Sequence, residues 1–258
     1  LREGPETPWE FLGDWAAPGK SGELWPGYWP TLRENRLFNA CNYVQNLSAL
    51  SRIARVLGKD ADARAFENRS ADIRADLQRE FYDATTHRYS DGPKQQTALA
   101  YPLLVEAVPE VDRVAVMGNL LTDITQIQNG HLDTGVLGSR VLLDLLMQED
   151  RSDLIHDMVA KRTFPGWGHM MENGASTLWE HWFPAYSHLC SSIHNSYLSI
   201  GDWFFRGLGG IRPDWSRPGF AHTIIRPAFE CDLEYVHAEY DSVRGPIRSS
   251  WKKSERGI

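Results

Sequence analysis

The sequence predicts a mainly α protein made of paired helices, with a short β-rich segment at its C-terminal end. Apolar residues recur every three or four positions through most of residues 32–207, and short turns rich in Gly, Asp and Pro interrupt these runs. From Ile211 onward the pattern changes to Pro-containing turns and short alternating runs, as in β-strands. A chain of 258 residues with 42% hydrophobic residues is large and apolar enough to bury a substantial core.

The first helix pair is the most regular part of the pattern. Apolar positions keep a helical period from Leu32 to Gly58, and Asp60 begins a second helix that continues to Phe81. Because only Gly58–Lys59 separates the two helices, we expect them to form an antiparallel αα-hairpin.

The same period predicts five further helices, at residues 95–108, 111–127, 138–148, 152–162 and 193–207. Pro109 separates the first two of these helices. We expect Ser152 and Asp153 to cap the N-terminus of the fourth.

Two domains are expected, one of residues 1–210 and one of residues 211–258. Residues 1–30 are rich in Pro, Gly and Trp without any period, so we expect a loop there. Three later runs alternate as strands do, at residues 222–227, 231–241 and 245–252. Strands without closing partners leave an unpaired edge, so we expect the second domain to be truncated in this chain.

Composition argues against several kinds of partner. The net charge is −7 and no cluster of Lys and Arg is present, which argues against a nucleic acid or a membrane surface. No apolar run approaches the length of a membrane span and no signal peptide is visible, so the compartment stays unknown. Cys41, Cys190 and Cys231 lie far apart, and no metal or cofactor motif is present. We therefore expect neither a metal nor a cofactor.

Residues 164–182 have the composition of a sugar-binding loop. The stretch contains three Trp, two His and two Glu with glycines between them. An indole face covers the C–H face of a pyranose, imidazoles and carboxylates bind its hydroxyls, and a carboxylate can act as acid or base on a glycosidic bond. The candidate residues are Trp167, Glu172, Trp179 and Glu180.

His131 and Asp133 lie in another loop between predicted helix pairs. In a barrel of αα-hairpins alternate loops open at the same end, so polar side chains confined to these loops gather around one mouth. An α-solenoid scaffold would instead spread such residues along a helix face. A local hydrogen bond that orders the turn explains His131 and Asp133 equally well.

Five motifs together resemble a known enzyme family. They are GDW at 13–15, QTALAYPLL at 96–104, GHLDTGVLGSRVLLDLL at 130–146, PGWGHMMENGASTLWEHW at 165–182 and HNSYLSIGDWFFRGLGGI at 194–211. In this order they resemble the bacterial α-L-rhamnosidases of glycoside hydrolase family 78. The resemblance covers nearly the whole chain.

The resemblance implies a fold and a missing part. The family's catalytic domain is an (α/α)6 barrel of six helical hairpins followed by a β-sandwich, so this chain would hold the second half of the barrel and the start of the sandwich. The family's general acid is a Glu in a motif well before GDW, and residues 1–12 contain no match. We therefore expect a fragment whose general acid lies in an N-terminal remainder of the enzyme.

The resemblance also implies roles for single residues. Glu180 matches the general base that activates the attacking water, and His194 matches the histidine that binds the sugar in the −1 subsite. Trp15, and less directly Asp14, matches the aromatic wall of the sugar pocket. The segment between Glu180 and His194 is shorter than in the family, which leaves the substrate beyond the terminal sugar open.

Each of these roles has a structural alternative. Glu172 competes with Glu180 as base, and Glu180 is favoured because it lies between Trp179 and Trp182, where desolvation would tune its pKa. Glu172 would then brace the loop by capping backbone N–H groups. Packing or helix capping alone is the alternative for Trp15, Trp167 and His194.

The predicted function is hydrolysis, with inversion, of terminal α-L-rhamnose in glycosides or polysaccharides, without a metal ion. One alternative is another six-hairpin glycosidase, which the released monosaccharide would distinguish. The other is a catalytically incomplete chain that binds sugar without cleaving it.

Overall fold

The computed structural model describes residues 13–18, 31–183 and 191–254. The described α-helices are α1 (Leu32–Val56), α2 (Asp60–Phe81), α3 (Gln95–Leu104), α4 (Arg113–Thr122), α5 (Val136–Gln148), α6 (Ser152–Ala160), α7 (Trp167–Glu172) and α8 (Ile200–Trp203). A 3₁₀ turn, η2 (Glu110–Asp112), precedes α4, and π-helical turns η3 (Asp123–Ile127) and η4 (Phe204–Leu208) extend α4 and α8. No helix among these is both long and apolar enough to cross a membrane.

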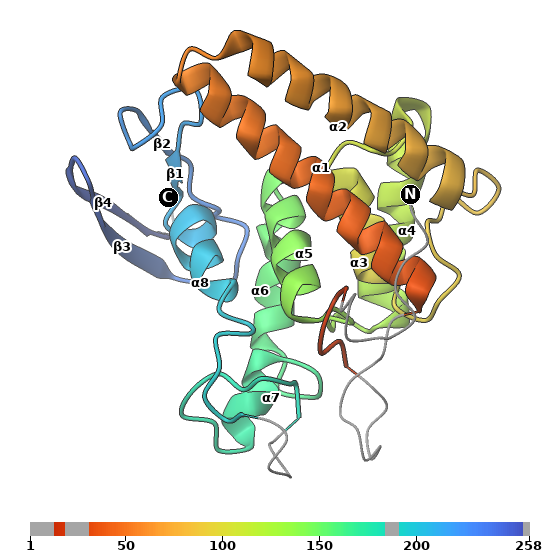
Figure 1. Ribbon diagram of the computed structural model, residues 1–258. Coiled ribbons are helices and arrows are strands. Elements are labelled where there is room, and N and C mark those ends of the chain that lie inside the picture. Colours follow the sequence, from red (N-terminus) through yellow and green to blue (C-terminus); the bar gives the residue numbers. More distant parts are fainter. Residues whose placement is uncertain (1–12, 19–30, 184–190, 255–258) are drawn as a thin grey trace.

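The first hairpin confirms the prediction for residues 32–81. Thr31 accepts a hydrogen bond from the Glu34 backbone N–H, and the Glu34 carboxylate accepts one from the Thr31 N–H, so a capping box begins α1. Gly58 takes a left-handed φ of 68° just after α1, the conformation that ends many helices at glycine. The two helices then run antiparallel, side by side (Figure 1).

Three helix pairs form two layers. In the inner layer, α3 packs against α1 on one side and α5 on the other, and α5 also contacts α8. In the outer layer, α2, α4 and α6 each pack against the inner helix that precedes them in the chain. Nearly every side chain of α3 is buried, as expected for a helix with neighbours on several sides.

Three predictions about helix ends are wrong. Ser152 and Asp153 do not cap α6, because Ser152 Oγ accepts a hydrogen bond from Trp203 Nε1 and the Asp153 carboxylate binds the Arg151 guanidinium. The last helix starts at Ile200 instead of 193. The helix predicted at 95–108 already ends at Leu104.

The β-rich segment forms two separate antiparallel pairs within residues 211–254. Strand β1 (Ile211–Pro213) pairs with β2 (Thr223–Ile225), and β3 (Tyr235–Ser242) pairs with β4 (Gly245–Lys252). The Trp251 indole N–H donates to the Leu208 carbonyl at 2.9 Å, which ties β4 to the end of η4. The predicted strand at 245–252 is confirmed, and the other two are shorter or shifted.

Candidate active site

Two chain segments pair at the candidate site. The Glu180 backbone N–H donates to the Ser191 carbonyl at 3.0 Å, and the His194 N–H donates to the Leu178 carbonyl at 2.8 Å. These bonds join residues 191–194 to residues 178–180. The backbone groups are therefore not available to a helix, which explains why the last helix begins only at Ile200.

The Glu180 carboxylate is held at one oxygen. Its Oε2 accepts a hydrogen bond from the Ser191 N–H at 2.8 Å. Within the described part of the chain Oε1 has no hydrogen-bond partner, and the side chain is half-buried. A carboxylate fixed at one oxygen and open at the other can accept a proton from a water molecule in a defined direction.

His181 relates Trp15, Glu180 and His194 to one another. The ring centroids of Trp15 and His181 are 5.7 Å apart in an edge-to-face arrangement. Burial lowers the pKa of His181, while the charge of Glu180 raises it and that of His194 lowers it, so both groups are within electrostatic reach of the imidazole. His181 thus links the predicted residues: its ring contacts Trp15, and it lies within electrostatic reach of Glu180 and His194.

The His194 ring is exposed and is oriented by its neighbour. Its Nδ1 atom is hydrogen-bonded to the Ser196 hydroxyl. This contact leaves Nε2 without a hydrogen-bond partner among the described residues, so that it can bind a sugar hydroxyl. The helix-capping alternative for His194 does not match this arrangement, because α8 begins six residues later in the sequence.

Buried aromatic side chains pack next to this part of the chain. Trp182 is fully buried, donates from Nε1 to the Thr134 carbonyl at 3.0 Å and stacks on Tyr197 with ring centroids 3.7 Å apart. Trp167 is also buried and donates from Nε1 to the Tyr197 carbonyl. Trp179 is equally buried, so packing is the observed role of both indoles, and their contact with a sugar stays a prediction.

Asp14 fastens the segment that carries Trp15. Its buried carboxylate accepts hydrogen bonds from Thr97 Oγ1 at 2.6 Å, from the Gly135 N–H at 2.8 Å and from the Gly138 N–H at 2.7 Å. The last two amides lie at the N-terminus of α5, where a negative charge is stabilised by the helix dipole. Burial raises the pKa of Asp14, and these hydrogen bonds lower it. Contact of Asp14 with substrate stays a prediction.

Asp133 caps the N-terminus of α3, as Asp14 does that of α5. Its carboxylate accepts hydrogen bonds from the N–H groups of Gln95 and Gln96, the first two residues of that helix. The Asp133 N–H in turn donates to Gln96 Oε1 at 3.0 Å. Asp133 is 1% exposed, so the observed role is structural.

His131 connects two loops by its ring. Nδ1 donates to the Pro165 carbonyl at 3.0 Å, and Nε2 is hydrogen-bonded to the Thr163 hydroxyl at 3.0 Å. Both nitrogens are therefore engaged, and the loop of residues 130–135 is joined to the loop that leads to α7. Sugar contact by His131 and Asp133 stays a prediction.

Glu172 lies apart from these residues. It ends α7, is exposed, and forms an ion pair with Arg162 instead of capping backbone N–H groups. Its position at the end of a short helix also differs from the expectation of a continuous loop over residues 164–182.

Sequence reasoning overlooked Ser191 and Tyr197. Ser191 contributes only a backbone N–H to Glu180, which no residue type signals. Tyr197 falls inside a region predicted to be helical, and an aromatic residue there is read as core. Cys190 lies outside the described residues, whereas Cys41 and Cys231 are buried free thiols.

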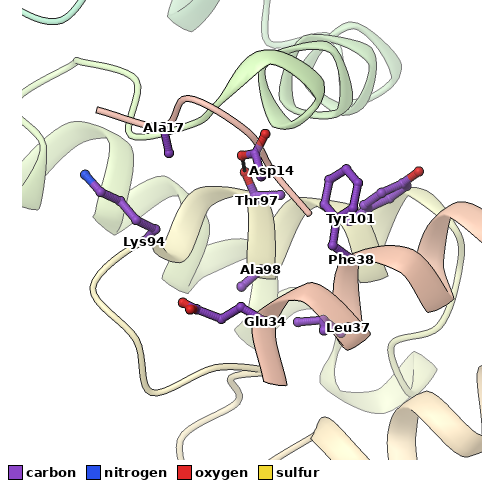
Figure 2. Close-up of a pocket in the computed structure, with 9 residues that line it drawn as sticks. All are labelled: Asp14, Ala17, Glu34, Leu37, Phe38, Lys94, Thr97, Ala98 and Tyr101. Atoms are coloured by element: carbon purple, nitrogen blue, oxygen red, sulfur yellow. Dashed lines mark hydrogen bonds between the residues drawn. The ribbon is translucent and has the colours of Figure 1, made fainter. Parts of the chain in front are cut away.

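A small pocket lies between residues 13–18 and the helices α1 and α3 (Figure 2). Asp14, Thr97, Lys94 and Glu34 line it together with apolar side chains of both helices. Its volume of about 40 Å³ has room for a few water molecules. Because Glu180 and His194 do not line it, we do not place a sugar there. No group of three or more His, Cys, Asp or Glu among the described residues is arranged to hold a metal ion.

The ionisation of Asp133 is expected to make stability depend on pH. Burial raises the pKa of Asp133 from 3.8 to about 7, with a further rise from the charge of Asp123 and an opposing effect of Lys94. The folded state thus binds the proton more tightly than the unfolded chain. The stability that this group contributes is complete below about pH 4 and is lost as the pH rises through about 7.

Asp133→Asn is therefore expected to become more stable relative to the parent protein as the pH rises from about 4 to about 8. At roughly 1.4 kcal/mol per pKa unit, the change in relative unfolding free energy is up to about 4 kcal/mol. Urea unfolding at a series of pH values measures it. Asp83→Asn is the control of opposite sign, because the Thr85 N–H lowers the pKa of that exposed carboxyl. Parallel pH profiles for Asp133→Asn and the parent would contradict the assignment.

Comparison with known proteins identifies the relatives of the chain. Residues 3–208 match the model of the bacterial alpha-L-rhamnosidase 6 hairpin glycosidase domain, and residues 210–258 match that of the bacterial alpha-L-rhamnosidase C-terminal domain. An alpha-L-rhamnosidase of Alteromonas sp. (strain LOR) is 28% identical over 96% of this chain and 27% of its own length. One from Streptomyces avermitilis is 28% identical over 84% of this chain and 21% of its own length.

Solved structures agree with these matches. The alpha-L-rhamnosidase from Dictyoglumus thermophilum superposes with a TM-score of 0.84 and 28% identity, over 94% of this chain and 26% of the other. The Streptomyces avermitilis enzyme complexed with L-rhamnose superposes with a TM-score of 0.80 and 25% identity, over 95% of this chain and 22% of the other. The chain thus spans about a quarter of the length of these relatives. The predicted fold class is confirmed, and the chain belongs to the bacterial α-L-rhamnosidase six-hairpin glycosidase family.

Proposed function

We propose that this chain forms part of an inverting α-L-rhamnosidase that releases terminal α-L-rhamnose from glycosides or polysaccharides. The observation that carries the proposal is the position of Glu180, whose carboxylate is held at one oxygen by the Ser191 N–H and acts electrostatically on His181, the residue that the Trp15 ring contacts. The names of the relatives support it, and one of them was solved with L-rhamnose.

Glu180, Trp15 and His194 each have a distinct task in this proposal. Glu180 takes a proton from a water molecule that attacks the anomeric carbon on the face opposite the leaving group. Trp15 covers the C–H face of the sugar ring, and His194 binds a hydroxyl through Nε2. The Ser191 N–H keeps Glu180 from turning away when no substrate is bound.

Inversion also requires an acid that protonates the leaving oxygen, about 6.5–9.5 Å from the base. Asp14 and Asp133 are committed to the N-termini of α5 and α3, so neither is suited to this task. We propose that the acid comes from an N-terminal remainder of the enzyme, because the relatives are about four times as long as this chain.

A catalytically incomplete sugar-binding chain is the second candidate. It is favoured because, among the predicted site carboxylates of the described structure, Asp14 and Asp133 accept hydrogen bonds at both oxygens and Glu172 is paired with Arg162, so none of them is suited to be the acid. Another six-hairpin glycosidase is distinguished by the sugar that it accepts.

The test combines turnover and binding. The chain is incubated with p-nitrophenyl α-L-rhamnopyranoside, and the anomeric form of the first product is read by proton NMR. Calorimetric titration with L-rhamnose, and with L-fucose for comparison, measures binding. Release of β-L-rhamnose as the first product supports the inverting mechanism, and binding without turnover supports the second candidate. The absence of both signals, or a preference for L-fucose, would contradict the proposal.

A further inference from the structure

Tyr197 connects residues 13–18 with the segment of residues 164–182. Its hydroxyl donates to the Ala16 carbonyl at 2.8 Å, its ring stacks on Trp182, and its own carbonyl accepts from Trp167 Nε1 at 3.1 Å. The residue is fully buried. Residues 16 and 197 lie 181 positions apart in the sequence, so this hydrogen bond joins parts of the chain that have no local connection.

The residue that Tyr197 binds has a strained backbone. Ala16 has a φ of 62°, in the left-handed region that alanine rarely adopts. Such a conformation persists only when the surroundings hold it. Two hydrogen bonds do so, one from Tyr197 to the Ala16 carbonyl and one from the Val136 N–H to the neighbouring Trp15 carbonyl at 2.7 Å.

The conformation of Ala16 bears directly on Trp15. Trp15 is the preceding residue, and its ring meets His181 edge to face, next to Glu180. If Ala16 relaxed to an ordinary φ, the chain on either side would rotate and the indole would leave this position. Asp14 anchors the other side of Trp15, so the indole is held between two fixed residues.

We propose that Tyr197 is a positioning residue of the active site, whose hydroxyl holds Ala16 in its strained conformation and thereby sets the indole of Trp15 against the sugar. The sugar-binding part of this inference rests on the proposed function. The group is suited to the task because burial raises the pKa of Tyr197, which keeps the hydroxyl protonated as a donor.

Tyr197→Phe removes only the hydroxyl and retains the ring that stacks on Trp182. We expect the affinity for L-rhamnose, measured by calorimetric titration, to fall about five- to tenfold. The Val136 amide is expected to exchange its hydrogen faster, because it donates to the Trp15 carbonyl. Hydrogen exchange needs no ligand, so this second readout is independent of what the chain binds.

Tyr89→Phe is the matched control. Tyr89 is 1% exposed, and its hydroxyl also donates to a backbone carbonyl, that of Ala107, at 2.9 Å. It lies between α2 and α3 in the chain, and its hydrogen bond and ring contact are made with Ala107 and Tyr82, which are not residues of the candidate site. We expect Tyr89→Phe to lower the melting temperature without changing L-rhamnose affinity or the exchange of the Val136 amide.

A double-mutant cycle tests whether Tyr197 acts through Trp15. In a Trp15→Phe background, Tyr197→Phe should add less than a twofold loss of L-rhamnose affinity. A full additive loss would overturn the proposal, as would equal effects of Tyr197→Phe and Tyr89→Phe. If the parent chain binds no L-rhamnose, the proposed function fails, and exchange of the Val136 amide alone decides the role of Tyr197.

Discussion

Glu180→Gln is expected to lower the hydrolysis of p-nitrophenyl α-L-rhamnopyranoside by about 10²–10⁴-fold. Glutamine has the size of glutamate, and its amide oxygen can still accept the Ser191 N–H, so the loop should keep its shape. The amide cannot take a proton from water. The affinity for L-rhamnose should therefore change little while the turnover number falls.

The aryl substrate makes this test specific for the general base. Nitrophenol is acidic enough to leave with little help from an acid, so its release reports mainly on the base. Glu172→Gln is the matched control, because it makes the same chemical change in an exposed residue that pairs with Arg162. Loss of turnover in Glu172→Gln instead, or comparable losses in both variants, would reverse the assignment of the base.

Gly138→Ala is expected to lower the free energy of unfolding by about 5 kcal/mol or more. An added Cβ would lie 2.1 Å from Asp14 Oδ2 and 2.1 Å from Thr97 Oγ1, closer than atoms can approach. Asp14 would have to move and abandon the Thr97 hydroxyl and two backbone N–H groups. Each unsatisfied buried group costs about 1–3 kcal/mol, more where a charge is involved.

Urea unfolding followed by tryptophan fluorescence measures this loss. Gly118→Ala is the control, because Gly118 lies within α4 and an added Cβ would meet nothing within 4 Å. That change should raise the unfolding free energy by up to about 1 kcal/mol, as expected for alanine in a helix. A Gly138→Ala protein as stable as the parent would show that Asp14 does not depend on this close approach.

The sequence predicted those helices whose ends are set by residues next to them in the chain. The Thr31–Glu34 capping box and Gly58 bound α1, and the turn after Gly58 places α2. The start of the last helix could not be predicted, because Ser191 and His194 exchange backbone hydrogen bonds with Glu180 and Leu178, and no local pattern signals this pairing. In that case tertiary pairing overrides helical periodicity.

The candidate site was only partly predictable for the same reason. The two loops expected to meet at one mouth do lie together, because His131 donates to the Pro165 carbonyl and Trp182 donates to the Thr134 carbonyl. The partners of Asp14, however, lie 121 and 124 residues away, so no spacing in the GDW motif indicates a helix cap. The support given by Tyr197 depends on an equally distant contact.

The carboxylates of Asp14 and Asp133 have a consequence for how this fold can be altered. Asp14 precedes Trp15 and Asp133 lies in the loop before α5, yet both complete helix N-termini, those of α5 and α3. An exchange of these loop segments between related enzymes would therefore also remove helix caps from the scaffold. Residues 173–176 are largely exposed, so substitutions there should cost less stability than substitutions of Asp14 or Asp133.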